Sequence, residues 1–142
     1  MKYLFLMLSL MFVDNSCSQS KINQDAISLE YTTQTRGAYK CIVINKKQVS
    51  TINKHGVKPN KKTCSEGDWS KLITVLKKID IENIPNLKAP SEDRFFDGAA
   101  IANLKITYYG SVYESQSFDH GNPPKEIAIL VKEILSISEN IE

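Results

Sequence analysis

The chain has 142 residues and a nearly balanced charge, with 18 lysines and arginines against 16 acids and a formal net charge of +2 at pH 7. A chain of this length supports one domain with a sizeable core but not two full domains. No recognition motif accompanies its basic residues, so nucleic-acid binding is not expected. These quantities describe an ordinary globular domain.

The first segment, residues 1–16, has the pattern of a secretory signal peptide. Lys2 precedes a run over residues 3–13 that is apolar except for Ser9, and Ser16, a small residue, stands directly before Cys17. The run is too short to span a bilayer as a helix. We therefore expect residues 1–16 to be removed during export.

Cys17 behind this run resembles the lipobox of bacterial lipoproteins, in which the cysteine receives the lipid. Asp14 stands where the lipobox usually has Leu, Val or Ile. Ordinary cleavage near Ser16 or Ser18, which would leave a soluble secreted protein, is therefore the alternative. The polar residues 17–25 are expected to form a flexible tether. The expected location is the periplasm or the outer membrane, with the lipid on Cys17 as the membrane contact.

The next part of the chain is rich in β-formers and in lysine. Alternation predicts three strands, over residues 27–33, 39–44 and 49–53, and then a loop at 55–60. Residues 31–65 contain Arg36 and seven lysines but no acid. Such lysines commonly protect hairpins and edge strands against association, and we favour this interpretation. Contact with anionic headgroups or with an acidic partner is the alternative.

Cys41 and Cys64 remain as a pair if Cys17 is acylated. In an oxidising envelope compartment they would form a disulfide that stabilises the fold by roughly 3 kcal/mol. Two buried free thiols are the alternative. Neither cysteine belongs to a closely spaced pair, and the only histidines are His55 and His120. No metal site and no cofactor is therefore expected.

Two helices are predicted. Ser65 and Asp68 resemble a capping box at the start of the first, and Asn122, followed by two prolines, suggests the start of the second. Each helix has an apolar face, formed by Trp69, Leu72, Ile73, Leu76 and Ile79 in the first and by Ile127, Leu130, Val131, Ile134 and Leu135 in the second. These faces are typical of core packing rather than of a cofactor site.

Between the helices, residues 86–98 have no hydrophobic period. Alternation then predicts a hairpin with strands over 99–108 and 112–118 and a turn at 109–111. The order strands, helix, strands, helix predicts an α+β domain over residues 26–142. We expect a single antiparallel β-sheet of about five strands with two α-helices packed on one face.

The sequence contains no catalytic motif, phosphate loop or metal-ligand motif. Hairpin pairing would bring four polar residues to one end of the sheet, namely Arg94, Asp97, Asp119 and His120. An Asp beside a His can serve general-base chemistry or bind a metal, and Arg94 could bind an anion. The same residues can instead shape turns, with Arg94 clamping a carboxylate, and we favour this interpretation.

Residues 94–100 (RFFDGAA) and 117–124 (SFDHGNPP), together with the partial lipobox, resemble small uncharacterised envelope lipoproteins of Bacteroidetes-type bacteria. The similarity covers most of the mature domain and implies no activity. The expected function is that of an exported, lipid-anchored binding module with a protein partner in the envelope, for instance an inhibitor of a secreted enzyme. A small hydrolase or metal-binding enzyme that uses Asp97, Asp119 and His120 is the alternative, and a purely structural envelope component is a third.

Overall fold

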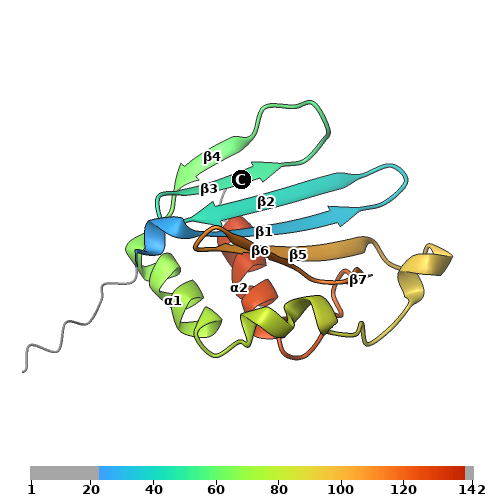
Figure 1. Cartoon of the computed structure of the whole chain (residues 1–142). Helices are drawn as coiled ribbons and strands as arrows, with labels where there is room; N and C mark the ends of the chain where they lie inside the picture. Colours follow the sequence, from blue (N-terminus) through green and yellow to red (C-terminus); the bar gives the residue numbers. More distant parts are fainter. Residues whose placement is uncertain (1–22, 140–142) are drawn as a thin grey trace, which may run out of the picture.

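A computed structural model describes residues 23–139, in which one antiparallel β-sheet carries two α-helices on one face (Figure 1). The protein therefore belongs to the α+β class, as predicted. The expected signal peptide, Cys17 and residues 17–22 of the expected tether lie outside the described residues. Within residues 23–139, no helix has the length and apolar character needed to cross a membrane.

The described part of the sheet has seven strands, two more than predicted. They are β1 (Ile27–Gln34), β2 (Tyr39–Asn45), β3 (Gln48–Ile52), β4 (Asn60–Thr63), β5 (Ile101–Tyr108), β6 (Ser111–Glu114) and β7 (Phe118–Asp119). Six of them lie in the order β4-β3-β2-β1-β5-β6, and β7 pairs with the start of β5. All pairs are antiparallel.

The two additional strands are defined by pairing rather than by side-chain alternation. β4 overlaps the end of the predicted loop and has no apolar alternation, yet all four of its residues pair with β3. The predicted strand 112–118 is split into β6 and β7, because residues 115–117 leave the regular ladder. Ser115 still makes two hydrogen bonds to Leu104. The Ser115 amide donates to the Leu104 carbonyl at 2.8 Å, and the Leu104 amide donates to the Ser115 hydroxyl oxygen at 3.0 Å.

The helix-covered face of the sheet contains the core. Register places Leu29 of β1 between Ile44 and Ile106 of the neighbouring strands, and all three are fully buried. Each such side chain contributes roughly 1.5–3 kcal/mol through burial. The opposite face carries the alternate residues, such as Glu30, which forms an ion pair with Lys105 at 2.9 Å. This one-sided burial explains the alternation in the sequence.

The first helix, α1 (Glu66–Leu76), agrees with its prediction. The Ser65 hydroxyl accepts a hydrogen bond from the amide of Asp68 at 3.1 Å, which confirms the predicted cap. Its apolar face packs into the core through Trp69, Leu72, Ile73 and Leu76. Lys77 is the C-cap of α1. Ile79 therefore lies just beyond the helix, where it packs at the rim of the core.

The second helix, α2 (Ala128–Glu139), begins later than predicted. Asn122 does not cap it, since the Asn122 side-chain amide donates to the Ser91 hydroxyl at 2.8 Å. The two prolines after Asn122 have no backbone N–H, and residues 123–127 form an irregular turn before the helix starts. The predicted apolar face still points into the core, where the buried residues are Ile127, Leu130, Val131 and Ile134.

Three short 3-10 helices complete the described fold. The stretch without a hydrophobic period contains part of η2 (Ile81–Asn86) and all of η3 (Asp93–Phe96). The third, η1 (Gln24–Ala26), precedes β1, and the Gln24 side chain accepts a hydrogen bond from the Trp69 indole at 2.8 Å. Residues 24 and 25, which the sequence analysis places in the tether, therefore pack on the domain.

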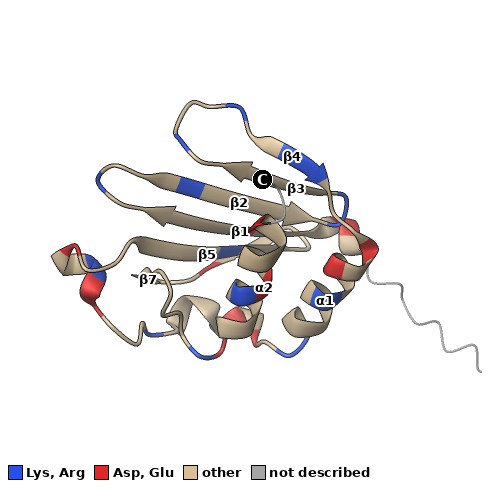
Figure 2. Ribbon diagram, turned by 180° about the vertical axis from the view of Figure 1, so that it is seen from behind, with Lys and Arg blue, Asp and Glu red and all other residues tan. Residues whose placement is uncertain are grey.

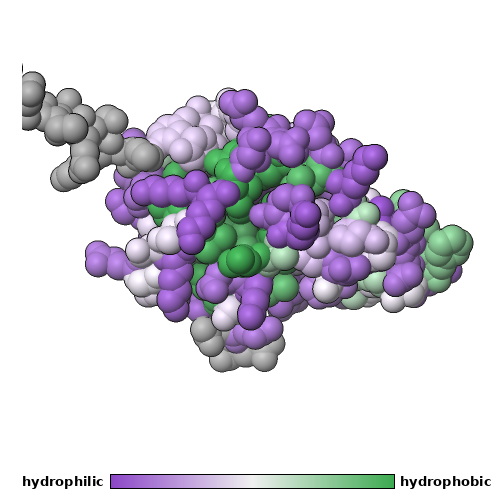
Figure 3. Space-filling model, turned by 90° about the horizontal axis from the view of Figure 1, so that it is seen from below, coloured by the Kyte–Doolittle hydropathy of each residue, from purple (hydrophilic) through white to green (hydrophobic). Residues whose placement is uncertain are grey.

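The helix-bearing face retains some apolar surface. Figure 3 shows hydrophobic residues in the middle of this face, surrounded by hydrophilic side chains. A hollow of about 200 Å³ is lined by Ile73, Leu76, Lys77, Ile79, Ile81 and Tyr108. Ligand pockets usually measure about 300–1,000 Å³, so this hollow is a packing seam rather than a ligand site.

The predicted disulfide between Cys41 and Cys64 is wrong, because both residues are free thiols. Cys41 pairs with Ile52, whereas Cys64 follows β4 at the other end of β3, where its amide donates to the carbonyl of Lys47 at 3.1 Å. A five-residue offset along a strand is about 17 Å, well beyond the roughly 7 Å that a disulfide can bridge between Cα atoms. Burial raises the pKa of both thiols.

Candidate functional site

The four candidate residues lie at the end of the sheet where β5 begins and β7 ends. β7 pairs with β5 through Ile101 and Asp119, and η3 lies beside β7 with Arg94 against Asp119. Hairpin pairing thus correctly predicted that the Arg94 loop and Asp119 lie at the same end of the sheet. We call residues 94–97, which project from this end of the sheet, the tip (Figure 1).

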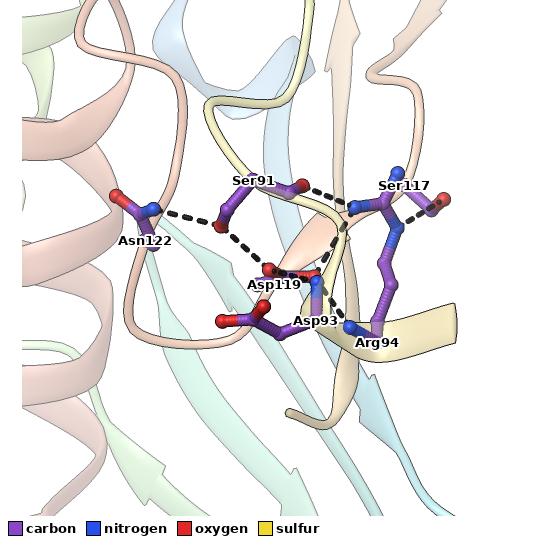
Figure 4. Close-up of polar contacts among 6 residues, drawn as sticks. All are labelled: Ser91, Asp93, Arg94, Ser117, Asp119 and Asn122. Carbon is purple, nitrogen blue, oxygen red and sulfur yellow. Dashed lines mark hydrogen bonds and ion pairs between the residues drawn. The ribbon is translucent and has the colours of Figure 1, made fainter. Parts of the chain in front are cut away.

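Asp119 is the centre of a buried polar network (Figure 4). Its Oδ1 accepts hydrogen bonds from the amide of Arg94 at 2.9 Å and from Nη1 of Arg94 at 3.1 Å. Its Oδ2 accepts from the amide of Asp93 at 2.9 Å and from the hydroxyl of Ser91 at 2.5 Å. These four donors occupy the acceptor positions of the carboxylate. The part of the favoured interpretation in which Arg94 clamps a carboxylate is confirmed for Asp119, whereas the backbone amides that bond to this carboxylate are distant in sequence rather than local.

Arg94 is equally occupied. Besides Asp119, its Nη1 donates to the carbonyl of Ser91 at 2.6 Å and its Nε donates to the hydroxyl of Ser117 at 3.1 Å. Its guanidinium carbon lies 4.2 Å from the centroid of the Phe95 ring. Arg94 therefore holds the tip in place and is not a free anion-binding group. The sequence gives no signal for the roles of Ser91 and Ser117, because only the fold brings them together.

The network determines the protonation of Asp119. Burial acts to raise the pKa of this carboxyl, but hydrogen bonds from Ser91, from Arg94 and from the Asp93 amide outweigh it and lower the pKa from 3.8 to about 2. A general base works best with a pKa near the working pH. Asp119 is therefore a stable anion at neutral pH and a very weak base.

Asp97 and His120 do not join this network. His120 follows β7 in a turn, and its Nδ1 hydrogen-bonds with the hydroxyl of Tyr31 at 2.9 Å rather than with Asp119. Asp97 instead forms an ion pair with Arg36 at 3.0 Å. Within residues 23–139, no three His, Cys, Asp or Glu side chains are grouped to hold a metal ion. The three candidate catalytic side chains thus lie at one end of the sheet without converging.

The tip presents two aromatic side chains that the sequence analysis did not select as site residues. Phe95 is 63% exposed and Phe96 is 82% exposed. The backbone beneath them is closed by a hydrogen bond from the amide of Gly98 to the carbonyl of Asp93 at 2.9 Å. A Cβ on Gly98 would lie 3.2 Å from Cβ of Asp93, so this close approach favours glycine. The tip therefore combines a fixed backbone with exposed rings.

Two surface hollows adjoin the tip. The first, of about 670 Å³, lies between the β1–β2 turn and the start of β5 and is lined by Gln34, Thr35, Arg36, Gly37, Arg94, Asp97, Gly98, Ala99, Ala100 and Ile101. The second, of about 480 Å³, lies between the same turn and the β3–β4 loop and is lined by Gln34, Thr35, Arg36, Gly37, Ala38, Tyr39, Asn53, Lys54 and His55. Arg36 therefore stands between two concave surfaces.

Among the described residues, this end of the molecule presents exposed surface, while its candidate polar side chains do not converge on one point. It presents exposed aromatic rings, shallow concave surfaces and an exposed arginine, while its buried carboxylate is fully engaged. Comparison of the chain with protein-family models, with curated proteins and with solved structures found no match in any of the three. The function is therefore inferred from the geometry of this end of the molecule.

Proposed function

We propose that this protein is an exported, lipid-anchored envelope protein that binds a protein partner through the tip and the adjoining 670 Å³ hollow. The observation that carries the proposal is the exposure of Phe95 and Phe96 on a segment whose backbone Asp119 and Gly98 hold in place. Aromatic side chains on a preorganised backbone are effective interface anchors, because they bury a large area at little cost in conformational entropy.

The surface next to the rings supports the same proposal. Ile101 is 43% exposed and lines the hollow together with Ala99 and Ala100. The polar residues Gln34 and Arg36 line the same hollow beside these aliphatic side chains. An apolar centre with a polar rim is the usual anatomy of a protein interface.

The topology also fits an anchored binding protein. The first described residue, Asn23, lies at the opposite end of the sheet from the tip (Figure 1). β1 alone extends about 27 Å between these ends, from its eight residues. A lipid on Cys17 would be connected to Asn23 by six peptide units, which span at most about 20 Å. The tip would then face away from the membrane that holds the protein.

The alternative of a small hydrolase has less support. Asp119 uses both carboxylate oxygens in structural hydrogen bonds, and its low pKa makes it a poor base. His120 shares its Nδ1 with the buried Tyr31, and Asp97 is turned toward Arg36. A catalytic set needs groups directed at a common reacting atom, and these groups are not.

Photo-crosslinking tests the proposed interface. A benzophenone amino acid replaces Phe96 in the full chain, produced in its native host, and the crosslinked proteins are identified by mass spectrometry. The matched control carries the same probe at Ile129 of α2, which is 64% exposed but lies outside the tip. We expect one abundant adduct at position 96 that is absent at 129 and is lost when Phe95→Ala accompanies the probe.

Equal crosslinking at both positions, or none at position 96, would contradict the proposed interface. The anchoring is tested separately by mass spectrometry of the mature N-terminus. We expect an acylated Cys17 and release of the Cys17→Ala protein from the membrane or its accumulation unprocessed. An unmodified N-terminus near Gln19 in the wild type would contradict lipid anchoring and would indicate a secreted protein.

A further inference from the structure

The 480 Å³ hollow beside the tip is lined by two permanently charged cations, Arg36 and Lys54. Arg36 and Lys54 line it together with His55, and none of its lining residues, all within the described part of the chain, is acidic. Figure 2 shows basic residues and no acidic ones in the β1–β2 turn and in the β3–β4 loop. His55 stacks on Tyr39 with ring centroids 3.8 Å apart, which gives the hollow a firm aromatic wall.

The two cations are available to a ligand. Arg36 is held only by Asp97, and the side chains of this pair are 90% and 67% exposed. Such an exposed pair contributes little and exchanges readily with another carboxylate. Lys54 forms no ion pair with any residue in the range 23–139 that the structure describes. A guanidinium also matches a carboxylate in a bidentate geometry, which favours a carboxylate-bearing ligand.

A second basic hollow on the molecule differs from this one. It measures about 330 Å³ and lies at the β4 edge, lined by Lys47, Gln48, Lys61, Lys62 and Thr63. Lys62 is already engaged, since its Nζ donates to the carbonyl of Ile137 near the C-terminus of α2 at 2.9 Å. These residues have no exposed aromatic neighbour of the kind found at the tip, and protection of the edge strand accounts for them.

From these contacts we infer that the partner presents an acidic peptide segment to the Arg36–Lys54 hollow, beside an apolar side chain that contacts Phe95 and Phe96. The inference rests on the proposed function and adds to it the chemistry of the partner. The charged hollow orients the acidic segment of the partner and raises the rate of association, while the Phe95 and Phe96 rings supply the apolar contact.

The test uses two fluorescein-labelled eight-residue peptides with a central Leu-Leu pair, one with three glutamates on each side and the other with three glutamines on each side. Binding to the full mature chain in detergent is measured by fluorescence anisotropy. We expect the glutamate peptide to bind about tenfold more tightly or better, and to weaken as the salt concentration rises. Arg36→Glu with Lys54→Glu should remove this preference, whereas Lys46→Glu with Lys47→Glu, which changes the net charge equally at the opposite end, should retain it.

Equal affinity for the two peptides, absence of binding at millimolar concentration, or an equal loss in both double variants would overturn the acidic segment. Displacement of the glutamate peptide by inorganic phosphate but not by glutarate would assign the hollow to a phosphate ligand and would also overturn it. The crosslink at position 96 separates the two proposals. If it persists undiminished in the Arg36→Glu, Lys54→Glu protein, the acidic segment is wrong and the tip interface stands; if it is absent in the wild type, the tip interface itself is wrong.

Discussion

Two arginine–aspartate pairs lie at the same end of the molecule, with nitrogen–oxygen distances of 3.1 and 3.0 Å and opposite surroundings. The side chains of Arg94 and Asp119 are 7% and 3% exposed, whereas those of Arg36 and Asp97 are 90% and 67% exposed. The buried pair is surrounded by further hydrogen bonds and excluded from water, while the exposed pair is solvated and screened. The two pairs thus differ in role despite equal distances. The buried pair of Arg94 and Asp119 fixes the tip, whereas the exposed pair of Arg36 and Asp97 can exchange with other charged groups.

The largest expected effect is that of Asp119→Ala. The substitution leaves Arg94 buried without its carboxylate and removes the acceptor of two backbone amides, so the melting temperature should fall by on the order of 10 °C. Asp97→Asn is the matched control, because it removes the charge of the exposed pair and keeps a residue type that tolerates the left-handed backbone at this position (φ 59°). It should change the melting temperature by no more than about 2 °C. Differential scanning calorimetry of both variants checks the contrast, and similar losses would show that burial does not distinguish the pairs.

Acid should weaken the buried pair in a defined window. The pKa of Asp119 is about 2 in the folded protein, below the usual value of about 3.9 for an unfolded chain. Its contribution is therefore fully present above about pH 4 and is lost as the pH falls toward 2. Thermal unfolding between pH 6 and pH 2 should show that the difference in melting temperature between the wild type and Asp119→Ala shrinks in this window. A difference that stays constant down to pH 2 would contradict the low pKa.

Gly98→Ala should loosen the tip with little effect on the rest of the fold. The added Cβ meets Asp93 at 3.2 Å, so the turn must open by a few tenths of an ångström, at a cost of about 1 kcal/mol in the free energy of unfolding. Gly67→Ala in α1 is the control, since its Cβ would meet nothing within 4 Å. That variant should gain about 0.5 kcal/mol from reduced chain entropy. Denaturant unfolding measures both, and equal signs would count against the close approach at Gly98.

Arg36→Ala should alter the free energy of unfolding by less than about 0.5 kcal/mol, because its ion pair with Asp97 is exposed. The same variant should reduce binding of the six-glutamate peptide. Urea unfolding and anisotropy on one protein preparation separate the two quantities. A large loss of stability would mean that the exposed pair is structural and would remove the contrast between the two pairs.

The smallest expected effect is that of divalent metal. Because Asp119 is saturated and Asp97 and His120 are directed elsewhere, addition of zinc or magnesium should leave the melting temperature of the wild type unchanged. Binding to the folded state alone would raise it. A metal-dependent rise that is lost in both Asp119→Ala and His120→Ala would favour the hydrolase.

The fold was predictable where burial leaves a period in the sequence. The alternation at residues 27–33 and the stripe from Trp69 to Leu76 are direct imprints of one-sided burial. β4 has no such imprint, since an exposed edge strand gains its order from backbone pairing alone. Asn122 resembles a helix cap, yet its side chain donates to Ser91 and its amide donates to the carbonyl of Asp119, and two prolines follow it.

The candidate site was predictable in its location but not in its convergence. Hairpin pairing brings the Arg94 and Asp119 segments to the same end of the sheet, and this placement does not depend on side-chain directions. Whether Asp97 and His120 turn toward the same point depends on the directions of side chains in a 3-10 helix and at the end of a strand, which spacing does not encode. The exposure of Phe96 likewise depends on whether distant segments of the chain pack over its ring. The sequence around Phe96 does not indicate this.

The bonds to Asp119 also impose an order on folding. They join the amides of Asp93 and Arg94 to a carboxylate 26 and 25 residues away, which β7 brings into place only after pairing with β5. Closing such a loop costs entropy that only the assembled sheet repays. Under the proposed function, only a chain that has closed this network presents the two phenylalanines to a partner in their final geometry.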